Sequence, residues 1–243
     1  MNDVKMYQVS TLQALAMGHT RSVVEVQELM KHGNTGLGTF AGVNGEMIVV
    51  DGQCYRANED GTVEEARPDM GVPFASVCTL SGARSFELGE FSNVDELKKE
   101  LNNKIEEDFG LNCMHMVRID GIFKKIDARS ESAYNAIHVS LKDILSANQR
   151  AFVFDEVKGT LICVYYPDFM DGINLSGWHL HFISDDRTQG GHVFDLEMEH
   201  GDVRLDKISN IELQLPTEPV FDTYSLKNAS EDDIKKVEQG DNK

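Results

Sequence analysis

Basic side chains are scarce in this chain of 243 residues. Lys and Arg together number 23, against 41 Asp and Glu, which gives a formal net charge of -18 at pH 7. A negative charge of this size opposes binding to nucleic acid phosphates and to anionic membrane surfaces. We therefore expect neither nucleic acid nor a membrane as a partner, and we interpret most acidic side chains as a solvated surface.

Paired cysteines and long apolar runs are also lacking. The four cysteines, Cys54, Cys78, Cys113 and Cys163, show no C-x-x-C spacing, which argues against both a disulfide framework and a zinc ribbon. No stretch approaches the roughly 18 apolar residues that a membrane span needs. The first ten residues, MNDVKMYQVS, also lack the basic and apolar regions of a signal peptide, so the expected location is the cytoplasm.

The hydrophobic fraction of 41% is enough for a core in one large or two small domains. Helix signals concentrate before residue 150 and strand signals run from Val157 to about Ile211, so we expect a domain boundary between 115 and 150. Capped helices are predicted after Ser10 or Thr11, between Ser22 and Gly33, after Asn93, after Ser140 and over 230–240. Turns between strands are predicted at Asn44-Gly45, where both residues tolerate positive φ, and at Asp120-Gly121.

Histidines gather in one part of the predicted sheet region. In GWHLHF, residues 177–182, the side chains of His179 and His181 share one face of a strand and those of Trp178, Leu180 and Phe182 share the other. If DDRTQGG forms the turn, a symmetric hairpin places His192 opposite His181, with their Cβ atoms about 4.5–5.5 Å apart.

Three imidazoles that converge and leave a coordination position open are typical of a catalytic zinc or a similar divalent ion, whereas structural zinc sites favour four ligands rich in cysteine. We interpret the other five histidines as surface or hydrogen-bonded core residues: His19, His32, His115, His138 and His200.

The chain resembles the alpha-acetolactate decarboxylase family, whose members are metal-dependent enzymes that make acetoin. The segments that carry the resemblance cover nearly the whole chain in order, and the last is the most specific. They are YQVSTLQAL (7–15), ELMKHGNTGLGTF (28–40), NGEMIVVDG (44–52), IDGIFKKIDAR (119–129), VKGTLICVYYP (157–167) and GWHLHFISDDRTQGGHVFD (177–195).

The resemblance implies an α+β fold and a homodimer. An N-terminal α/β domain with a mixed sheet would cover 1–115, and a C-terminal antiparallel β-barrel that carries the metal would cover 116–243. The implied site residues are the metal ligands His179, His181 and His192, the catalytic residues Glu46, Arg129 and Glu238, and the substrate-binding residues Thr39 and Arg129. Two segments depart from the family pattern: SESAYNAIHVS after Arg129 is shorter than usual, and DGQCYR replaces a more usual DGEFYR.

The implied reaction suits these residues. When 2-acetolactate loses CO2, electrons flow onto the ketone oxygen as an enediolate, for which one Zn²⁺ per chain is a natural Lewis acid. Thiamine diphosphate and pyridoxal phosphate are then not needed, and no G-D-G motif with a downstream N-N indicates thiamine. Protonation of one face of the enediolate gives (R)-acetoin.

Two of the implied residues are also informative by themselves. Glu46 shares a strand face with Ile48 and Val50, and a carboxyl group on an apolar face tends to have a raised pKa, which suits a general acid. The planar fork of Arg129 would hold the substrate carboxylate or stabilise the developing charge; the sequence does not separate these roles.

Two other functions fit parts of the pattern. A cupin-like metal oxygenase or isomerase would use His179, His181 and Asp185 as a two-histidine, one-carboxylate site. A non-enzymatic module would bind metal structurally or respond to pH. The first predicts iron and O2 consumption, and the second predicts a closed site without turnover.

Overall fold

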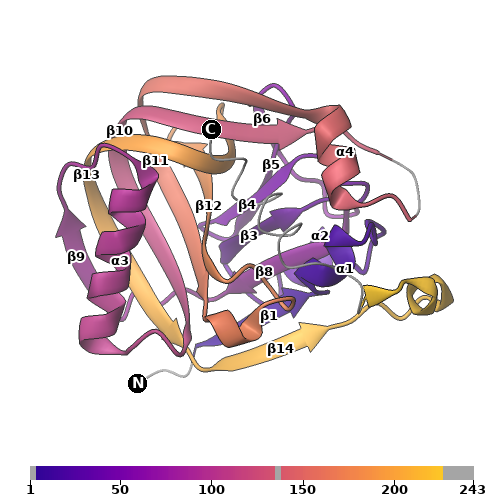
Figure 1. Ribbon diagram of the computed structural model, residues 1–243. Helices are drawn as coiled ribbons and strands as arrows, with labels where there is room; N and C mark the ends of the chain where they lie inside the picture. Colours follow the sequence, from indigo (N-terminus) through magenta and orange to yellow (C-terminus); the bar gives the residue numbers. More distant parts are fainter. Residues whose placement is uncertain (1–3, 135–137, 227–243) are drawn as a thin grey trace.

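Two β-sheets lie face to face in the computed structural model, which describes residues 4–134 and 138–226 (Figure 1). The first sheet has seven strands in the order β14-β1-β8-β3-β4-β5-β6. Their bounds are β1 (Lys5–Val9), β3 (Thr35–Thr39), β4 (Glu46–Val50), β5 (Gln53–Ala57), β6 (Val63–Glu65), β8 (Phe74–Cys78) and β14 (Asn210–Gln214). β14 pairs with β1 in parallel and the other neighbours pair antiparallel, so this sheet is mixed, as predicted.

The second sheet is antiparallel and has five strands in the order β10-β11-β12-β13-β9, with a further pairing of β10 with β13. Its strands are β9 (Arg84–Leu88), β10 (Met114–Glu131), β11 (Gln149–Tyr166), β12 (Gly177–Ser184) and β13 (Gly190–Ile208). The long strands curl so that β10 pairs with both β11 and β13. The β12–β13 ladder joins three residue pairs, and the closed barrel that the resemblance implies is not confirmed.

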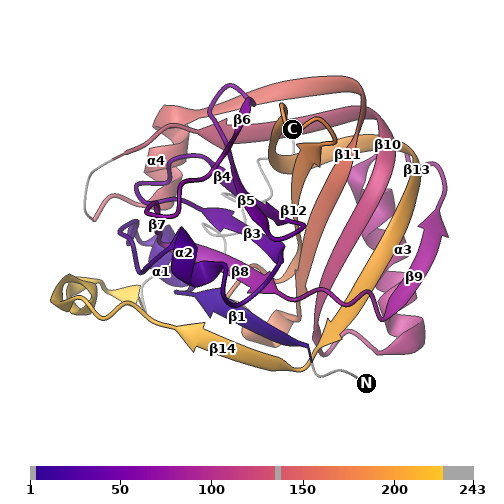
Figure 2. The same cartoon turned by 180° about the vertical axis from the view of Figure 1, so that it is seen from behind.

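Helices are few and mostly short. They are α1 (Leu12–Ala16), α2 (Val26–Leu29), α3 (Val94–Asp108), α4 (Leu141–Asn148) and the 3-10 helices η1 (Asp168–Met170) and η2 (Pro219–Thr223), beside a two-stranded sheet of β2 (Val24–Glu25) and β7 (Gly71–Val72). Figure 2 shows α1 and α2 beside the first sheet and α4 near the ends of β10 and β11. None of the helices in 4–134 and 138–226 has the length and apolar character needed to cross a membrane.

Apolar side chains fill both faces of the second sheet. Between the sheets, Ile48 and Val50 of β4 pack with Ile162 of β11 and Ile183 of β12. On the other face, Trp178, Leu180 and Phe182 of β12 pack with the apolar stripe of α3, whose buried residues are Val94, Leu97, Leu101 and Ile105. Because β12 alternates, His179 and His181 point into the layer between the sheets.

The helix caps show where the sequence patterns hold. Thr11 caps α1, Asn93 caps α3 and Ser140 caps α4, each with a side-chain oxygen that accepts a backbone N–H. The predicted helix between Ser22 and Gly33 is wrong in extent, since α2 covers only 26–29 and 24–25 form β2. The Ser22 hydroxyl donates to the Val24 carbonyl instead of capping a helix, and β-branched valines there favour the extended backbone. The predicted helix over 230–240 lies outside the described residues.

Of the two turns predicted from glycines, one is confirmed and one is wrong. The β3–β4 hairpin is confirmed, but its connection covers 40–45, and positive φ occurs at Gly42, Val43 and Gly45. The predicted turn at Asp120-Gly121 is wrong, because β10 runs straight through it. Gly121 pairs with Gly159 of β11 and Gly201 of β13, and a Cβ at Gly121 would lie 2.7 Å from a backbone oxygen of β13. Close strand packing, and not a turn, therefore requires this glycine.

Elements from each half of the chain belong to the sheet of the other half. β14 extends the first sheet beside β1, and β9 extends the second sheet beside β13. The proposed boundary between two domains stays a prediction.

Candidate metal centre

His179 and His181 of the HxH pattern meet His192 of the following strand in the layer between the sheets. His181 pairs directly with His192 across the β12–β13 ladder, which confirms the predicted register. All three rings are buried, with 7%, 0% and 4% exposure for His179, His181 and His192. In the described part of the chain, these three residues form the group whose ligand atoms converge closely enough to hold a metal ion.

Two distances between the ligand atoms are close to those at a tetrahedral zinc ion. His179 Nε2 lies 3.1 Å from His181 Nε2 and 3.1 Å from His192 Nδ1. Two nitrogens that bind one tetrahedral zinc at about 2.0–2.1 Å are separated by about 3.3 Å. Three neutral imidazoles with one remaining position suit a divalent ion such as zinc, and the donor set alone does not identify the metal.

Burial keeps the rings of His179 and His181 neutral. It lowers the pKa of His179 to about 3, with a smaller contribution from the Arg129 cation. Burial and the neighbouring His179 hold the pKa of His181 well below its ordinary value. His181 Nδ1 lies 2.8 Å from the Met47 carbonyl oxygen. Because a carbonyl only accepts, Nδ1 carries the proton and Nε2 presents its lone pair to the metal position.

Glu46 lies beside the ligand nitrogens. It is the first residue of β4, and its carboxylate oxygens are 3.4 Å from His181 Nε2 and 4.0 Å from His192 Nδ1. Ile48 and Val50 follow it on the face between the sheets, as the alternation predicts. A carboxyl group at this point can coordinate a metal or exchange a proton with a bound molecule.

Arg129 and Thr39 complete the polar side of the centre. Arg129 of β10 pairs with His192 of β13, and its Nη2 lies 3.3 Å from His192 Nε2. Thr39 pairs with Glu46 across the β3–β4 ladder, and its hydroxyl donates to the Gly45 carbonyl at 2.9 Å. The structure thus brings together six of the seven site residues predicted from the sequence, and the seventh, Glu238, lies outside the described residues.

Five of these six residues line one cavity, and His181 lies behind its wall. Its polar lining includes Thr39, Glu46, Arg129, His179 and His192, and its apolar lining includes Leu15, Val43, Phe74, Leu141 and Leu145. The apolar wall comes from α1, α4, the β3–β4 hairpin and the start of β8, and no local sequence pattern indicated it.

Two polar groups of this region were also missed by sequence reasoning. Glu131, with 1% exposure, lines the cavity two residues after Arg129, and strand alternation from Arg129 would have indicated it. The Met47 carbonyl that orients His181 is a backbone group, for which the sequence carries no signal. Asp185, the carboxylate of the cupin-like alternative, is exposed in the β12–β13 turn and does not join the histidine group.

Comparisons with known sequences identify relatives of this chain. The profile of a family described as alpha-acetolactate decarboxylase matches residues 6–228. The alpha-acetolactate decarboxylase of Methanosarcina mazei is 37% identical over 234 residues, which cover 96% of this chain and 80% of the relative. That of Bacillus subtilis is 33% identical over 224 residues, which cover 92% and 86%.

Solved structures show the same fold. The crystal structure of alpha-acetolactate decarboxylase from Bacillus subtilis superposes with a TM-score of 0.91 at 33% identity, over 96% of this chain and 99% of that chain. A Staphylococcus aureus protein described as similar to alpha-acetolactate decarboxylase gives a TM-score of 0.89 at 27% identity, over 96% and 100%. With fold and relatives in agreement, the chain is a carboxy-lyase. It belongs to the alpha-acetolactate decarboxylase family.

Proposed function

We propose that this chain converts 2-acetolactate to (R)-acetoin and CO2 with one zinc ion held by His179, His181 and His192. The observation that carries the proposal is the convergence of three buried imidazoles and a carboxylate, of which His179, His192 and Glu46 line one cavity. A closed structural site would not face a cavity. The exposed position of Asp185 removes the carboxylate on which the cupin-like alternative depends.

A divalent ion bound here supplies a Lewis acid for the substrate ketone and hydroxyl oxygens. The histidines contribute fixed, unprotonated nitrogens, because burial lowers the pKa of His179 and His181. The Met47 carbonyl holds the His181 ring in the tautomer that binds metal. The layer of apolar side chains between the sheets excludes bulk water and strengthens each electrostatic contact.

Glu46 holds the proton that the product needs. After CO2 leaves, one carbon must accept a proton from a fixed direction to give one enantiomer of acetoin. The Glu46 carboxyl is within 4.0 Å of two ligand nitrogens, so it faces any molecule bound at the metal position. General acid catalysis from such a position is worth about 10²–10⁴-fold in rate.

Arg129 is the cation that meets the anionic substrate. Its guanidinium is mostly buried, lines the cavity and lies beside His192. A planar fork here binds a carboxylate and orients the bond that breaks. Thr39 is proposed to contact the substrate, and Glu238, on the resemblance alone, to supply a second acid. The homodimer and the cytoplasmic location also stay predictions.

The test is the reaction itself. Zinc-loaded protein is incubated with racemic 2-acetolactate, and CO2 and acetoin are followed by chiral chromatography. We expect one CO2 per (R)-acetoin, loss of activity after treatment with a chelator, and recovery on adding zinc. Acetoin formation no faster than in protein-free solution would reject the proposal. O2 consumption would favour an oxygenase, and bound zinc without turnover would favour a structural metal module.

A further inference from the structure

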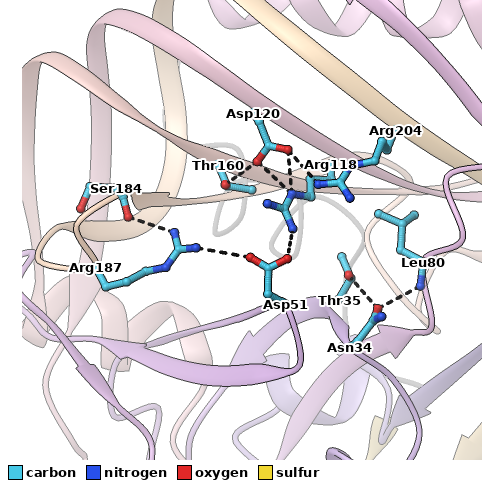
Figure 3. Close-up of polar contacts among 10 residues, drawn as sticks. All are labelled: Asn34, Thr35, Asp51, Leu80, Arg118, Asp120, Thr160, Ser184, Arg187 and Arg204. Carbon is cyan, nitrogen blue, oxygen red and sulfur yellow. Dashed lines mark hydrogen bonds and ion pairs between the residues drawn. The ribbon is translucent and has the colours of Figure 1, made fainter.

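A network of ion pairs joins the two sheets beyond the far end of β4 (Figure 3). The Asp51 carboxylate accepts from the Arg118 guanidinium and, at 3.5 Å, from Arg187 Nη2. Arg118 Nε also donates to the Asp120 carboxylate at 2.8 and 2.9 Å. Asp120 accepts in addition from Arg204 Nη2 at 2.9 Å and from the Thr160 hydroxyl at 2.7 Å.

Asp51 lies next to one element of the metal centre and contacts residues of two other segments that carry it. Its own turn joins β4 to β5, and β4 begins with Glu46 and the Met47 carbonyl that orients His181. Arg187 lies in the turn between β12 and β13, the strands of His181 and His192. Arg118 lies on β10, the strand of Arg129. The Asp51 carboxylate thus links the β4–β5 hairpin, the β12–β13 hairpin and β10. Side chains of these same three elements meet at the metal centre, which lies some five residues, or about 16 Å, from Asp51 along β4.

The turns at both ends of the Asp51–Arg187 contact are tightly built. Asp51 and Gly52 have φ of 54° and 76° and connect the paired residues Val50 and Gln53, which is the two-residue turn that fits the twist of a hairpin. Arg187 has φ of 61°, and its Nη1 donates to the Ser184 carbonyl at 3.1 Å. Its guanidinium also lies over the Tyr55 ring, 5.8 Å from the centroid. The two turns are therefore held to each other.

A movement of either turn would displace the metal-binding histidines, because only a few paired residues separate them. The pair Ile183–Gly190 borders the β12–β13 turn and lies two rungs from His181–His192. Within a paired ladder a strand moves as a unit, so a change in how the two hairpins are held alters the distance from β4 to β12. That distance sets the Met47–His181 hydrogen bond and the position of Glu46 relative to the ligand nitrogens.

We propose that Asp51 is a positioning residue for the metal centre, which holds the β4–β5 hairpin against the β12–β13 hairpin and β10. Exposed ion pairs are individually weak, but the Arg118 side chain is only 11% exposed, so loss of Asp51 leaves a mostly buried guanidinium with Asp120 alone. The inference rests on the metal-binding part of the proposed function and does not depend on the substrate.

The test is D51N, read out by zinc affinity and by the absorption spectrum of the Co²⁺-loaded protein. Asn tolerates positive φ, so the turn is kept while the charge is lost. Changes in groups that orient metal ligands typically weaken metal binding about 10–100-fold; because Asp51 acts through two strands, we expect roughly a tenfold weaker zinc affinity and an altered Co²⁺ spectrum. R187Q, which removes one arm of the network, should weaken zinc binding by roughly threefold.

The matched control is E90Q, which breaks the exposed Lys124–Glu90 ion pair. This ion pair joins β10 to the loop after β9 and touches neither hairpin, so E90Q should keep the wild-type zinc affinity and Co²⁺ spectrum. The double variant D51N/R187Q should lose less zinc-binding free energy than the sum of the two single losses, because both substitutions remove the same Asp51–Arg187 contact.

Wild-type zinc affinity and Co²⁺ spectrum in folded D51N would overturn the proposal, even if its thermal midpoint falls, because the network would then serve stability alone. Should D51N not fold, R187Q decides by the same two measurements. Failure of the proposed function would appear differently, as a zinc-loaded wild-type protein without turnover of 2-acetolactate, and would leave the zinc affinities interpretable.

Discussion

Two sets of buried histidines can be compared in this molecule. His179, His181 and His192 lie between the sheets with at most 7% exposure, and His19 and His115 are 0% exposed elsewhere. Burial lowers the pKa of the isolated rings as well, to about 4 for His115. Both sets therefore contain buried imidazoles whose pKa is lowered by burial.

The two sets differ in what the rings face. His19 packs against the rings of Phe221 and Tyr224, and His115 packs between Phe109 and Tyr165. The nitrogens of the three clustered rings instead point at one position. Burial and a lowered pKa thus do not mark a functional histidine here, whereas convergence of lone pairs does.

Removing one clustered ring should have the largest effect. H181A deletes a ligand whose tautomer is fixed by Met47, and two histidines hold zinc far more weakly than three. We expect zinc to fall from about one to below about 0.1 per chain, with at least a ~10³-fold loss of turnover. Metal analysis and the acetoin assay measure both. In the isolated set, H115F should keep metal and turnover; full metal content in H181A would remove the distinction between the sets.

Replacing Glu46 separates binding from reactivity within the cluster. E46Q keeps the shape of the side chain and removes the exchangeable proton, so the histidines should still bind zinc while kcat falls by about 10²–10⁴-fold. Stopped assays for kcat together with metal analysis give the two quantities. If turnover stays near normal, the acid that protonates the product is another group.

Exchanging Arg129 for lysine should have a smaller effect. R129K keeps the charge beside His192 but replaces a planar fork by a point ammonium, which costs about 10–100-fold in kcat/KM. A rise in KM alone would show that Arg129 holds the ground-state carboxylate, and an equal fall in kcat and kcat/KM would show that it acts in the transition state. Unchanged kinetics would remove Arg129 from the site.

Much of the centre could be predicted because it depends on local periodicity. The HxH alternation and the length of the DDRTQGG turn place His181 opposite His192 without knowledge of the rest of the fold. The same alternation places Glu46 on the face of Ile48 and Val50. Local patterns of this kind survive because strand geometry has a fixed period of two.

Contacts between distant segments could not be predicted in this way. The Met47 carbonyl reaches His181 across 134 positions of sequence, and β14 joins β1 in parallel from the far end of the chain. Gly121 appeared to mark a turn, since the same residue type serves turns and close strand packing. The Asp51 network has no motif, because each of its contacts depends on how the two sheets meet.

The last expected effect concerns the pH dependence of folding stability at the isolated His115, and it leaves turnover unchanged. Burial lowers its pKa from 6.5 to about 4, so between these values the unfolded chain binds a proton that the folded chain does not. Folding stability of the metal-free protein should therefore fall as the pH drops below about 6.5, and this contribution should level off below about pH 4. Across that window the histidine accounts for ~3 kcal/mol.

H115F removes this proton and keeps a ring between Phe109 and Tyr165. Its free energy of unfolding, measured with urea at pH 7, 6, 5 and 4.5 in the presence of a chelator, should fall less steeply with pH than that of the wild-type chain. Because other groups titrate equally in both proteins, the difference in slope isolates His115. Parallel curves would mean that His115 takes up its proton in the folded state at an ordinary pH, and burial would then not be a property that the two sets of histidines share.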